Sequence, residues 1–446
     1  MIRNAPAARK SVVSPFSEQL TFWLVRNRNF VLLWAAYGVA AFGDHLSEIA
    51  LLKERRAFDR EDLTRVQALI TFGFFLPFVL LGPLAGWWCD RFSRKGTMIV
   101  ADLLRAALVF NLAAIVAGLT RALPPAWGDH AIVLPLVAVG TLAAFFSPAR
   151  QALLPTLIRS DQLVRANALI SALGTIGGIL SAVVGGYLVQ RLGPQQNYHL
   201  NALTFVLSAA CVAGIAMART RAAPHPPLAG VWAPVRACLH YVRTHGRVGQ
   251  LIGLATVYWA AAGVVISVIP AIARLYYGED YSAAGTLRGV LVFGLACGAG
   301  AMTLLGPALS IPTTIRLGLG LAAVWLLGLA VTVVLKLGPR ADLGPVPAGV
   351  CLFGIGGAGA ALLVTIMACL QRFVPDSRRG RVFGVADTCT MAAIVASTGL
   401  LGLPRFEQLD RYIPMLLGVT AAGMLLALVV AERQHRAWSR RPRSTP

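Results

Sequence analysis

The segment GPLAGWWCDRFSRKGTM, Gly82–Met98, joins two long apolar runs through a short charged turn. The runs are Val66–Cys89 and Thr97–Leu119. As a helix, each is long enough to cross a hydrocarbon core of about 30 Å. The charges gather where the two runs meet, because water is available only there. This pattern predicts a helical hairpin whose turn lies at a membrane surface.

The same alternation of apolar runs and short polar turns continues along the whole chain. Of its 446 residues, 57% are hydrophobic and 13% are charged, and the mean hydropathy is +0.68. A soluble domain carries about 25% charged residues. The sequence therefore predicts an all-α integral membrane protein with twelve transmembrane helices, at Phe30–Leu52, Val66–Cys89, Thr97–Leu119, Ala131–Ala149, Ala166–Val189, Leu200–Met217, Val248–Ile272, Leu287–Leu309, Thr313–Leu335, Val346–Leu370, Val382–Leu403 and Tyr412–Val430.

The net charge of +21 suggests either a nucleic-acid partner or the basic cytoplasmic loops of a membrane protein. An even number of spans places both termini on one side. With that side cytoplasmic, and with Arg288 and Arg316 in the first turns of their spans counted with the adjoining loops, the inner segments hold 26 of the 40 Lys and Arg residues and the outer loops hold 13. Arg105 lies inside a span. This asymmetry predicts a multi-pass plasma membrane protein (bacterial inner membrane) with both termini cytoplasmic and no nucleic-acid partner.

The longest polar gap divides the chain into two sets of six spans. We expect a cytoplasmic N-terminal segment at 1–29, a first bundle at 30–217, a linker at 218–247, a second bundle at 248–430 and a basic tail at 431–446. The segment before the eleventh span, with Asp376, Arg379 and Arg381, has a loose counterpart about 215 residues earlier, before the fifth. The two halves are therefore expected to be repeats.

The charged turn also carries a recognisable pattern. Gly86, Asp90, Arg91, Arg94 and Lys95 give G-x-x-x-D-R-x-x-R-K, which resembles the signature loop of the major facilitator superfamily. The resemblance implies the major facilitator fold, in which two six-helix bundles are related by pseudo-symmetry. It also implies that this loop is a conformational latch that holds the outward-open state.

The latch prediction assigns roles to individual residues. By resemblance, Asp90 lies near the N-terminus of the eleventh span, where the helix dipole favours an anion. Arg91 and Arg94 then pair with nearby carboxylates, Asp387 and Asp102 being candidates. Asp387 is equally a candidate substrate or proton site. Gly86 permits close approach of helices. Asp102 and Arg105, at i,i+3 spacing, can pair with each other, and we expect this pair to be structural.

The first span contains the other set of ionisable residues, in AFGDHLSEIALL, Ala41–Leu52. Helical spacing puts Asp44 and Glu48 on one face with Tyr37, and His45 at the edge of that face. A charge that faces lipid costs several kcal/mol, so this face is predicted to line a water-filled cavity. Substrate binding or proton coupling is one interpretation, with His45 or Glu48 tuning the pKa of Asp44.

A structural interpretation of this face stays open. In it, Glu48 pairs with Lys53 or Arg55 at the rim of the cavity, and Asp44 only holds helices together.

The sequence contains no pattern of an enzyme or a cofactor protein. GxSxG, HExxH and P-loop motifs are absent, and the seven cysteines have no spacing typical of a metal or disulfide framework. GIGGAG, Gly354–Gly359, fits a dinucleotide fingerprint but lies inside an apolar run, so close helix packing explains it better. We therefore expect no catalytic residues, no metal and no cofactor.

Two further stretches narrow the resemblance within the superfamily. FGDHLSEIALL and FFSPARQALLPTLIRSDQLVRANALIS resemble the branch of enterobactin-type siderophore exporters and macrolide efflux proteins, and also the bacterial lysophospholipid transporters. The resemblance implies a monomer in the lipid bilayer with a small-molecule or lipid substrate. Proton-coupled export of an amphipathic drug or siderophore by an antiporter is the favoured function, and lysophospholipid transport is the alternative.

Overall fold

The chain is helical throughout the residues described by the computed structural model, which are 26–159, 162–216, 240, 242, 244–305, 309–338, 344–406 and 408–439. The helices of the first half are α2 (Arg28–Glu54), α3 (Leu63–Arg91), α4 (Arg94–Phe110), α5 (Leu112–Ala122), α6 (Val133–Leu157), α7 (Leu163–Leu192) and α8 (Pro194–Ala213). Those of the second half are α10 (Gly246–Tyr277), α11 (Tyr281–Leu305), α12 (Ile311–Leu337), α13 (Val346–Phe373), α14 (Asp376–Leu401) and α15 (Ile413–Ser439). Short 3-10 turns, η1 (Ala57–Asp59), η2 (Pro125–Ile132), η6 (Pro404–Phe406) and η7 (Leu409–Tyr412), lie in the connections.

Eleven of the twelve predicted spans each coincide with one long helix, the third coincides with the bent pair α4 and α5, and the all-helical fold class is confirmed. Within the described residues, ten helices are by themselves long and apolar enough to cross a membrane, and the bent pair α4 and α5 adds an eleventh. The remaining helix, α8, begins six residues before the predicted span and carries the buried amides of Asn197 and Asn201. Its polar first turns hydrogen-bond to neighbouring helices, so low hydropathy does not prevent burial.

The third predicted span is not one straight helix. The axes of α4 and α5 differ by 63° at Asn111, whose side-chain amide donates to the carbonyl of Ala107 at 2.9 Å. A side chain that bonds to the backbone in this way competes with the helix, which explains the break at this residue. By contrast, α6 runs unbroken through Pro148 and Pro155.

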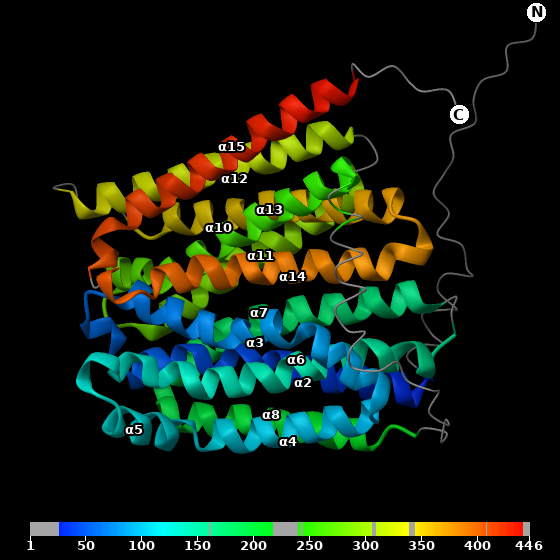
Figure 1. Ribbon diagram of the computed structural model, residues 1–446. Helices are drawn as coiled ribbons and strands as arrows, with labels where there is room; N and C mark the ends of the chain where they lie inside the picture. The colour runs from blue at the N-terminus through cyan, green and yellow to red at the C-terminus, as the bar shows by residue number, and fades with distance from the viewer. Residues whose placement is uncertain are drawn as a thin grey trace, which may run out of the picture.

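The two halves lie side by side as separate groups of helices, the first half below and the second above in Figure 1. They meet through α3 and α7 of the first half and α10, α11 and α14 of the second. We call the end of the bundle where α2 and α10 begin and α8 ends the linker end, and the other the opposite end. The halves make close contact toward the opposite end, where Gly285 of α11 packs against the backbone of Ala182 in α7.

Toward the linker end the facing helices separate. A Cβ atom on Gly399 or Gly402 of α14 would touch Phe72 or Leu69 of α3, respectively. Nearer the linker end, a Cβ atom on Gly86 of α3 or on Gly384 of α14 would have no other atom within 4 Å. The close helix approach expected at Gly86 is not seen in this conformation and stays a prediction.

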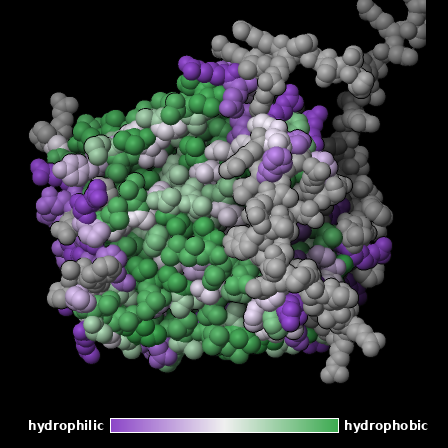
Figure 2. Space-filling model, in the orientation of Figure 1, coloured by the Kyte–Doolittle hydropathy of each residue, from purple (hydrophilic) through white to green (hydrophobic). Residues whose placement is uncertain are grey.

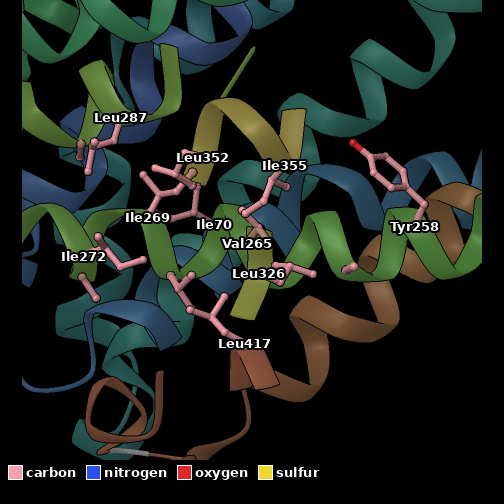
Figure 3. Close-up of a cluster of buried hydrophobic side chains, with 14 of the residues drawn as sticks. Ile70, Tyr258, Val265, Ile269, Ile272, Leu287, Leu326, Leu352, Ile355 and Leu417 are labelled. Atoms are coloured by element: carbon pink, nitrogen blue, oxygen red, sulfur yellow. The ribbon is translucent and has the colours of Figure 1, made fainter. Parts of the chain in front are cut away.

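The hydrophobic core continues across the contact between the halves. Figure 3 shows Ile70 of α3 among Ile269 of α10 and Leu352 of α13, and all three side chains are buried. Close backbone packing also holds the second half together, since Gly294 and Gly298 of α11 lie against the backbone of α13. The interpretation of GIGGAG as helix packing is confirmed, because Gly356 within it lies against the backbone of α11.

The outer surface matches a membrane protein. Figure 2 shows a broad hydrophobic band across the middle of the molecule, with hydrophilic residues gathered at the two ends of the helices. Many large apolar side chains are exposed, among them Leu80, Val324 and Val419. Exposed apolar area of this extent is typical of a surface covered by lipid.

Candidate functional site

A cavity of about 310 Å³ lies where the two halves face each other. Its wall is mostly apolar and aromatic, with side chains such as Phe75, Trp259 and Leu295. His45 of α2 and Arg288 of α11 are its ionisable residues, and Thr71 and Tyr258 add hydroxyl groups. An apolar cavity with a few convergent polar groups is the usual form of a small-molecule site.

The polar side of this cavity is a contact between the halves. Glu48 of α2, which is 8% exposed, forms an ion pair with Arg288 of α11. His45 lies beside both, since its Nδ1 is 3.4 Å from Glu48 Oε1 and 3.4 Å from Arg288 Nη2. The partners predicted for Glu48 are wrong: Lys53 donates to the carbonyl of Val189, and Arg55 binds Asp129.

Asp44 points to a different partner. It forms an ion pair with Arg105 of α4, which is 1% exposed, and the same guanidinium donates to Asp102 Oδ1 at 3.2 Å. Ser208 of α8 donates to the second oxygen of Asp102 at 2.6 Å, and the ring centroid of Phe205 is 4.0 Å from the guanidinium carbon. The pair of Asp102 and Arg105 is present as predicted, and Asp44 is a third member.

This cluster holds two carboxylates around one guanidinium. Among Asp44, Asp102 and Arg105, the net charge is −1 when both acids are ionised. Asp102 is fully buried, whereas the Asp44 side chain is 26% exposed. Asp44 is therefore the more accessible of the two acids.

Tyr37 lies farther along α2 toward the linker end and stacks with a cation. The guanidinium carbon of Arg150 in α6 is 4.2 Å from the Tyr37 ring centroid. The hydroxyl of Tyr37 faces Gly174 of α7, a residue that lines the cavity. Tyr37 therefore lies at the cavity margin and not beside Asp44.

The opposite end carries a second set of charges that joins the halves. The carboxylate of Asp410 in η7 accepts hydrogen bonds from the backbone N–H groups of Leu63 and Thr64, at 3.1 and 2.9 Å. Arg274 at the end of α10 donates to Asp410 at 2.9 Å and to the carbonyl of Phe58 at 3.2 Å. The second half thus caps the first turn of α3.

A network within the first half supports this contact. Asp129 accepts from Arg55 at 2.9 Å, from Arg60 at 2.7 Å and from Arg65 at 3.3 Å. Arg60 lies outside the membrane-spanning segments, and its hydrogen bond to Asp129 raises the pKa of the guanidinium above its usual value. These bonds keep the connection between α2 and α3 in one shape.

The sequence profile of the Major Facilitator Superfamily matches residues 29–398. The chain belongs to this superfamily. The relatives described below are named as transporters, so the chain is a transporter.

Three relatives of this major facilitator illustrate its range. An uncharacterized MFS-type transporter of Mycobacterium tuberculosis is 27% identical over 89% of both chains. The lysophospholipid transporter LplT of Serratia proteamaculans is 27% identical over 62% of this chain and 65% of its own. Macrolide efflux protein A of Streptococcus pyogenes is 30% identical over 36% of this chain and 37% of its own.

Among solved structures, a bacterial homologue of the iron transporter ferroportin in the inward-facing state matches 94% of this chain and all of its own, with a TM-score of 0.68. At 18% identity, this likeness shows the fold alone.

The signature loop of this major facilitator is only partly described. Asp90 lies in the last turn of α3, but its side chain lies outside the described residues. Arg94 donates to the carbonyl of Ala152 at 2.9 Å, and Lys95 donates to the carbonyls of Ala213 and Ile215 at 2.8 and 2.7 Å. Lys95 thus caps the C-terminal end of α8.

The carboxylate partners proposed for the latch arginines do not appear in this conformation. Arg91 lies 5.6 Å from the ring centroid of Trp87, and Asp102 is occupied by Arg105 and Ser208 instead of Arg94. The latch was predicted for the outward-open state, whereas here the halves are in contact toward the opposite end, so the role of Asp102 as a latch partner stays a prediction. Asp387 has an exposed side chain in α14 and pairs with no described cation.

The repeat segment of the second half forms the start of α14. Asp376, Arg379 and Arg381 lie in its first turns, and their side chains lie outside the described residues. Their role stays a prediction. Among the described residues, no group of three or more His, Cys, Asp or Glu side chains is placed to hold a metal.

Sequence reasoning missed three charged residues of this transporter. Arg288 is the second residue of the predicted span Leu287–Leu309, and its charge was counted with the outer loop, yet it lies two turns inside α11 at the cavity. Arg150 was assigned to a cytoplasmic segment and Asp410 to an outer loop. The sequence does give one indication that Arg288 lies in the membrane region. It is the only charged residue in LRGVLVFG, Leu287–Gly294, which is otherwise apolar.

Proposed function

We propose that this transporter exports an amphipathic small molecule, such as a drug or siderophore, in exchange for protons. The proposal rests on an apolar cavity between the halves, which His45 of α2 lines. Asp44, the preceding residue, shares the cation Arg105 with Asp102 in the interior of the first half. The apolar wall suits the body of an amphipathic substrate. The unequal number of acids and bases suits a proton that binds and leaves in each cycle.

Alternating access supplies the mechanism. The halves rock about the cavity, so that it opens first at one end of the bundle and then at the other. In the present conformation the halves are in contact toward the opposite end. Glu48 and Arg288 come from different halves, so their ion pair must change whenever the halves move apart. We place the linker end at the cytoplasm, because it carries the larger share of Lys and Arg.

The test uses proteoliposomes with a pH-sensitive dye inside, and compares wild type with Asp44→Asn. Siderophores, macrolides, cationic dyes and lysophospholipids are added in turn. We expect a proton signal triggered by one of the amphipathic drugs or siderophores in wild type, and its loss in Asp44→Asn. Glu61→Gln is the matched control, since Glu61 is exposed in the connection before α3 and lies outside the cavity. Loss of the signal in both variants, or in neither, would contradict the role of Asp44.

Lysophospholipid transport is the second candidate. Arg288 in an apolar wall can receive a phosphate group, and relatives named lysophospholipid transporters match up to 62% of the chain. If no compound moves protons while lysophospholipid crosses in wild type and Asp44→Asn alike, the exporter proposal fails and this one replaces it.

A further inference from the structure

A second cavity, also of about 310 Å³, lies within the second half at its linker end. It is enclosed by the first turns of α10 and α12, the last turn of α13 and the late part of α15. The ends of α12 and α15 that form it lie at the upper right in Figure 1. It shares no lining residue with the cavity between the halves. By their described lining residues, the two cavities are separate.

The rim of this cavity is basic. Arg247 of α10 and Arg316 of α12 line it, and Glu432 of α15 is the one acidic residue among the described residues of its lining. The Arg316 Nε lies 3.5 Å from Glu432 Oε2, and the two side chains are 51% and 27% exposed. An ion pair this long and this exposed is weak, so an anion of higher charge can compete with Glu432 for Arg316.

The helix ends add to the preference for an anion. Both α10 and α12 begin at this rim, at Gly246 and Ile311, and the N-terminal end of a helix carries a partial positive charge. Only α13 ends there, at Phe373, because α15 continues to Ser439. Two positive helix ends therefore face one negative end.

The floor of the cavity is apolar. Leu251 and Cys369 are 5% and 2% exposed, and Ile311, Ile315 and Phe373 complete the wall. A small free anion would gain nothing from contact with this apolar surface. A molecule with a phosphate and a hydrocarbon chain meets both surfaces at once, and the bilayer surrounds this end of the helices with such molecules.

We propose that this cavity is a site for an anionic phospholipid, whose phosphate lies between Arg247 and Arg316 and whose glycerol and upper acyl carbons cover Ile315 and Phe373. The lipid comes from the leaflet at the linker end. It ties α10, α12 and α13 together at their ends. This is a stabilising ligand of the second half and is distinct from the transported molecule.

Native mass spectrometry of the full chain tests the site. The purified protein is mixed with equal amounts of phosphatidylglycerol and phosphatidylcholine, and the ratio of the two bound lipids is measured. We expect wild type to prefer phosphatidylglycerol, and Arg247→Gln/Arg316→Gln to lower that preference about tenfold, as expected when charged hydrogen bonds are lost. The matched control is Arg372→Gln/Arg433→Gln, which removes two exposed charges at the same end from residues that do not line the cavity. We expect it to change the ratio less than about threefold, because exposed charges are screened by salt.

Three outcomes would overturn the proposal. They are equal binding of the two lipids by wild type, equal loss of preference in both double variants, and displacement of phosphatidylglycerol by millimolar inorganic phosphate, which would make this a free-anion site. If Arg247→Gln/Arg316→Gln does not fold, Glu432→Gln provides a second test, in which the preference for phosphatidylglycerol is expected to change in the opposite direction. It releases Arg316 from its weak pair, so the preference for phosphatidylglycerol must rise, and an unchanged or lower preference refutes the site.

Discussion

Arg105 is the cation that pairs with two carboxylates in the interior of the first half. It is buried, and it contacts carboxylates from its own helix and from α2. Helical spacing predicted its bond to Asp102, because residues at i and i+3 share a face. It did not predict the bond to Asp44, since periodicity within one segment does not show which side of another helix that segment meets.

Replacement of Arg105 is expected to destabilise the protein strongly. Arg105→Met leaves Asp44 and Asp102 without a cation, and breaking one side of a buried ion pair costs about 3–5 kcal/mol. The measurement is the thermal unfolding midpoint of the purified protein in detergent. The control is Arg121→Met, since Arg121 is exposed at the end of α5. Equal midpoints for the two variants would show that the cluster does not stabilise the fold.

The ion pair between Glu48 and Arg288 is expected to appear as energetic coupling between the halves. A double-mutant cycle with Glu48→Gln and Arg288→Gln should give a coupling of about 1–3 kcal/mol in unfolding free energy, as for residues in direct contact. The same cycle with Glu48→Gln and Lys53→Gln should give a coupling near zero, because Lys53 binds the end of α7. Similar values for both cycles would count against a specific contact.

At the scale of the element, the start of α3 shows what a sequence pattern leaves out. The apolar run predicted a span from Val66, but the helix begins at Leu63. Its first N–H groups bind the Asp410 carboxylate, which lies in the other half of the chain. A cap supplied from so far along the sequence has no local signal. By contrast, Asn27 caps α2 from within its own segment, by accepting from the N–H groups of Asn29 and Phe30.

Loss of the Asp410 carboxylate is expected to loosen the first turn of α3. Asp410→Asn replaces a charged acceptor by a neutral one, which weakens each bond by about 1 kcal/mol. Hydrogen exchange of the amides of Leu63 and Thr64 should then become about fivefold faster, as read by mass spectrometry of the peptide that contains them. Asp59→Asn is the control, since Asp59 is exposed nearby and does not bind these groups. An unchanged exchange rate in Asp410→Asn would show that the cap does not limit opening.

At the scale of the whole molecule, the sequence predicted the helices and the family correctly. It did not predict which end of the cavity is closed. That depends on contacts such as Gly285 against Ala182, where two helices from different halves approach at the level of the backbone. One amino-acid sequence encodes every state of the transport cycle, so hydropathy and motif spacing are the same for all of them.

A side chain at Gly285 is expected to favour separation of the halves at the opposite end. In Gly285→Ala the new Cβ would meet the carbonyl oxygen of Ala182, which disfavours the present conformation. Spin labels at positions 61 and 279, both exposed at the opposite end, report the separation by double electron–electron resonance after the seven native cysteines are replaced. We expect a larger share of long distances than in wild type.

Gly253→Ala is the matched control for that experiment, because a Cβ at Gly253 has no atom within 4 Å. A distance distribution for Gly285→Ala that matches this control would show that the contact does not set the balance between conformations.

The cap on α3 also bears on how this protein can change by mutation. The groups that Asp410 binds in α3 are main-chain N–H groups, which every amino acid except proline possesses. Leu63 and Thr64 are buried, so packing restricts their side chains, but the contact with Asp410 does not depend on which side chains they carry. The codon for Asp410 is more constrained, because the contact needs an acceptor side chain at that position. Among variants that remain folded, those at 63 and 64 should keep this contact between the halves, and those at 410 should lose it.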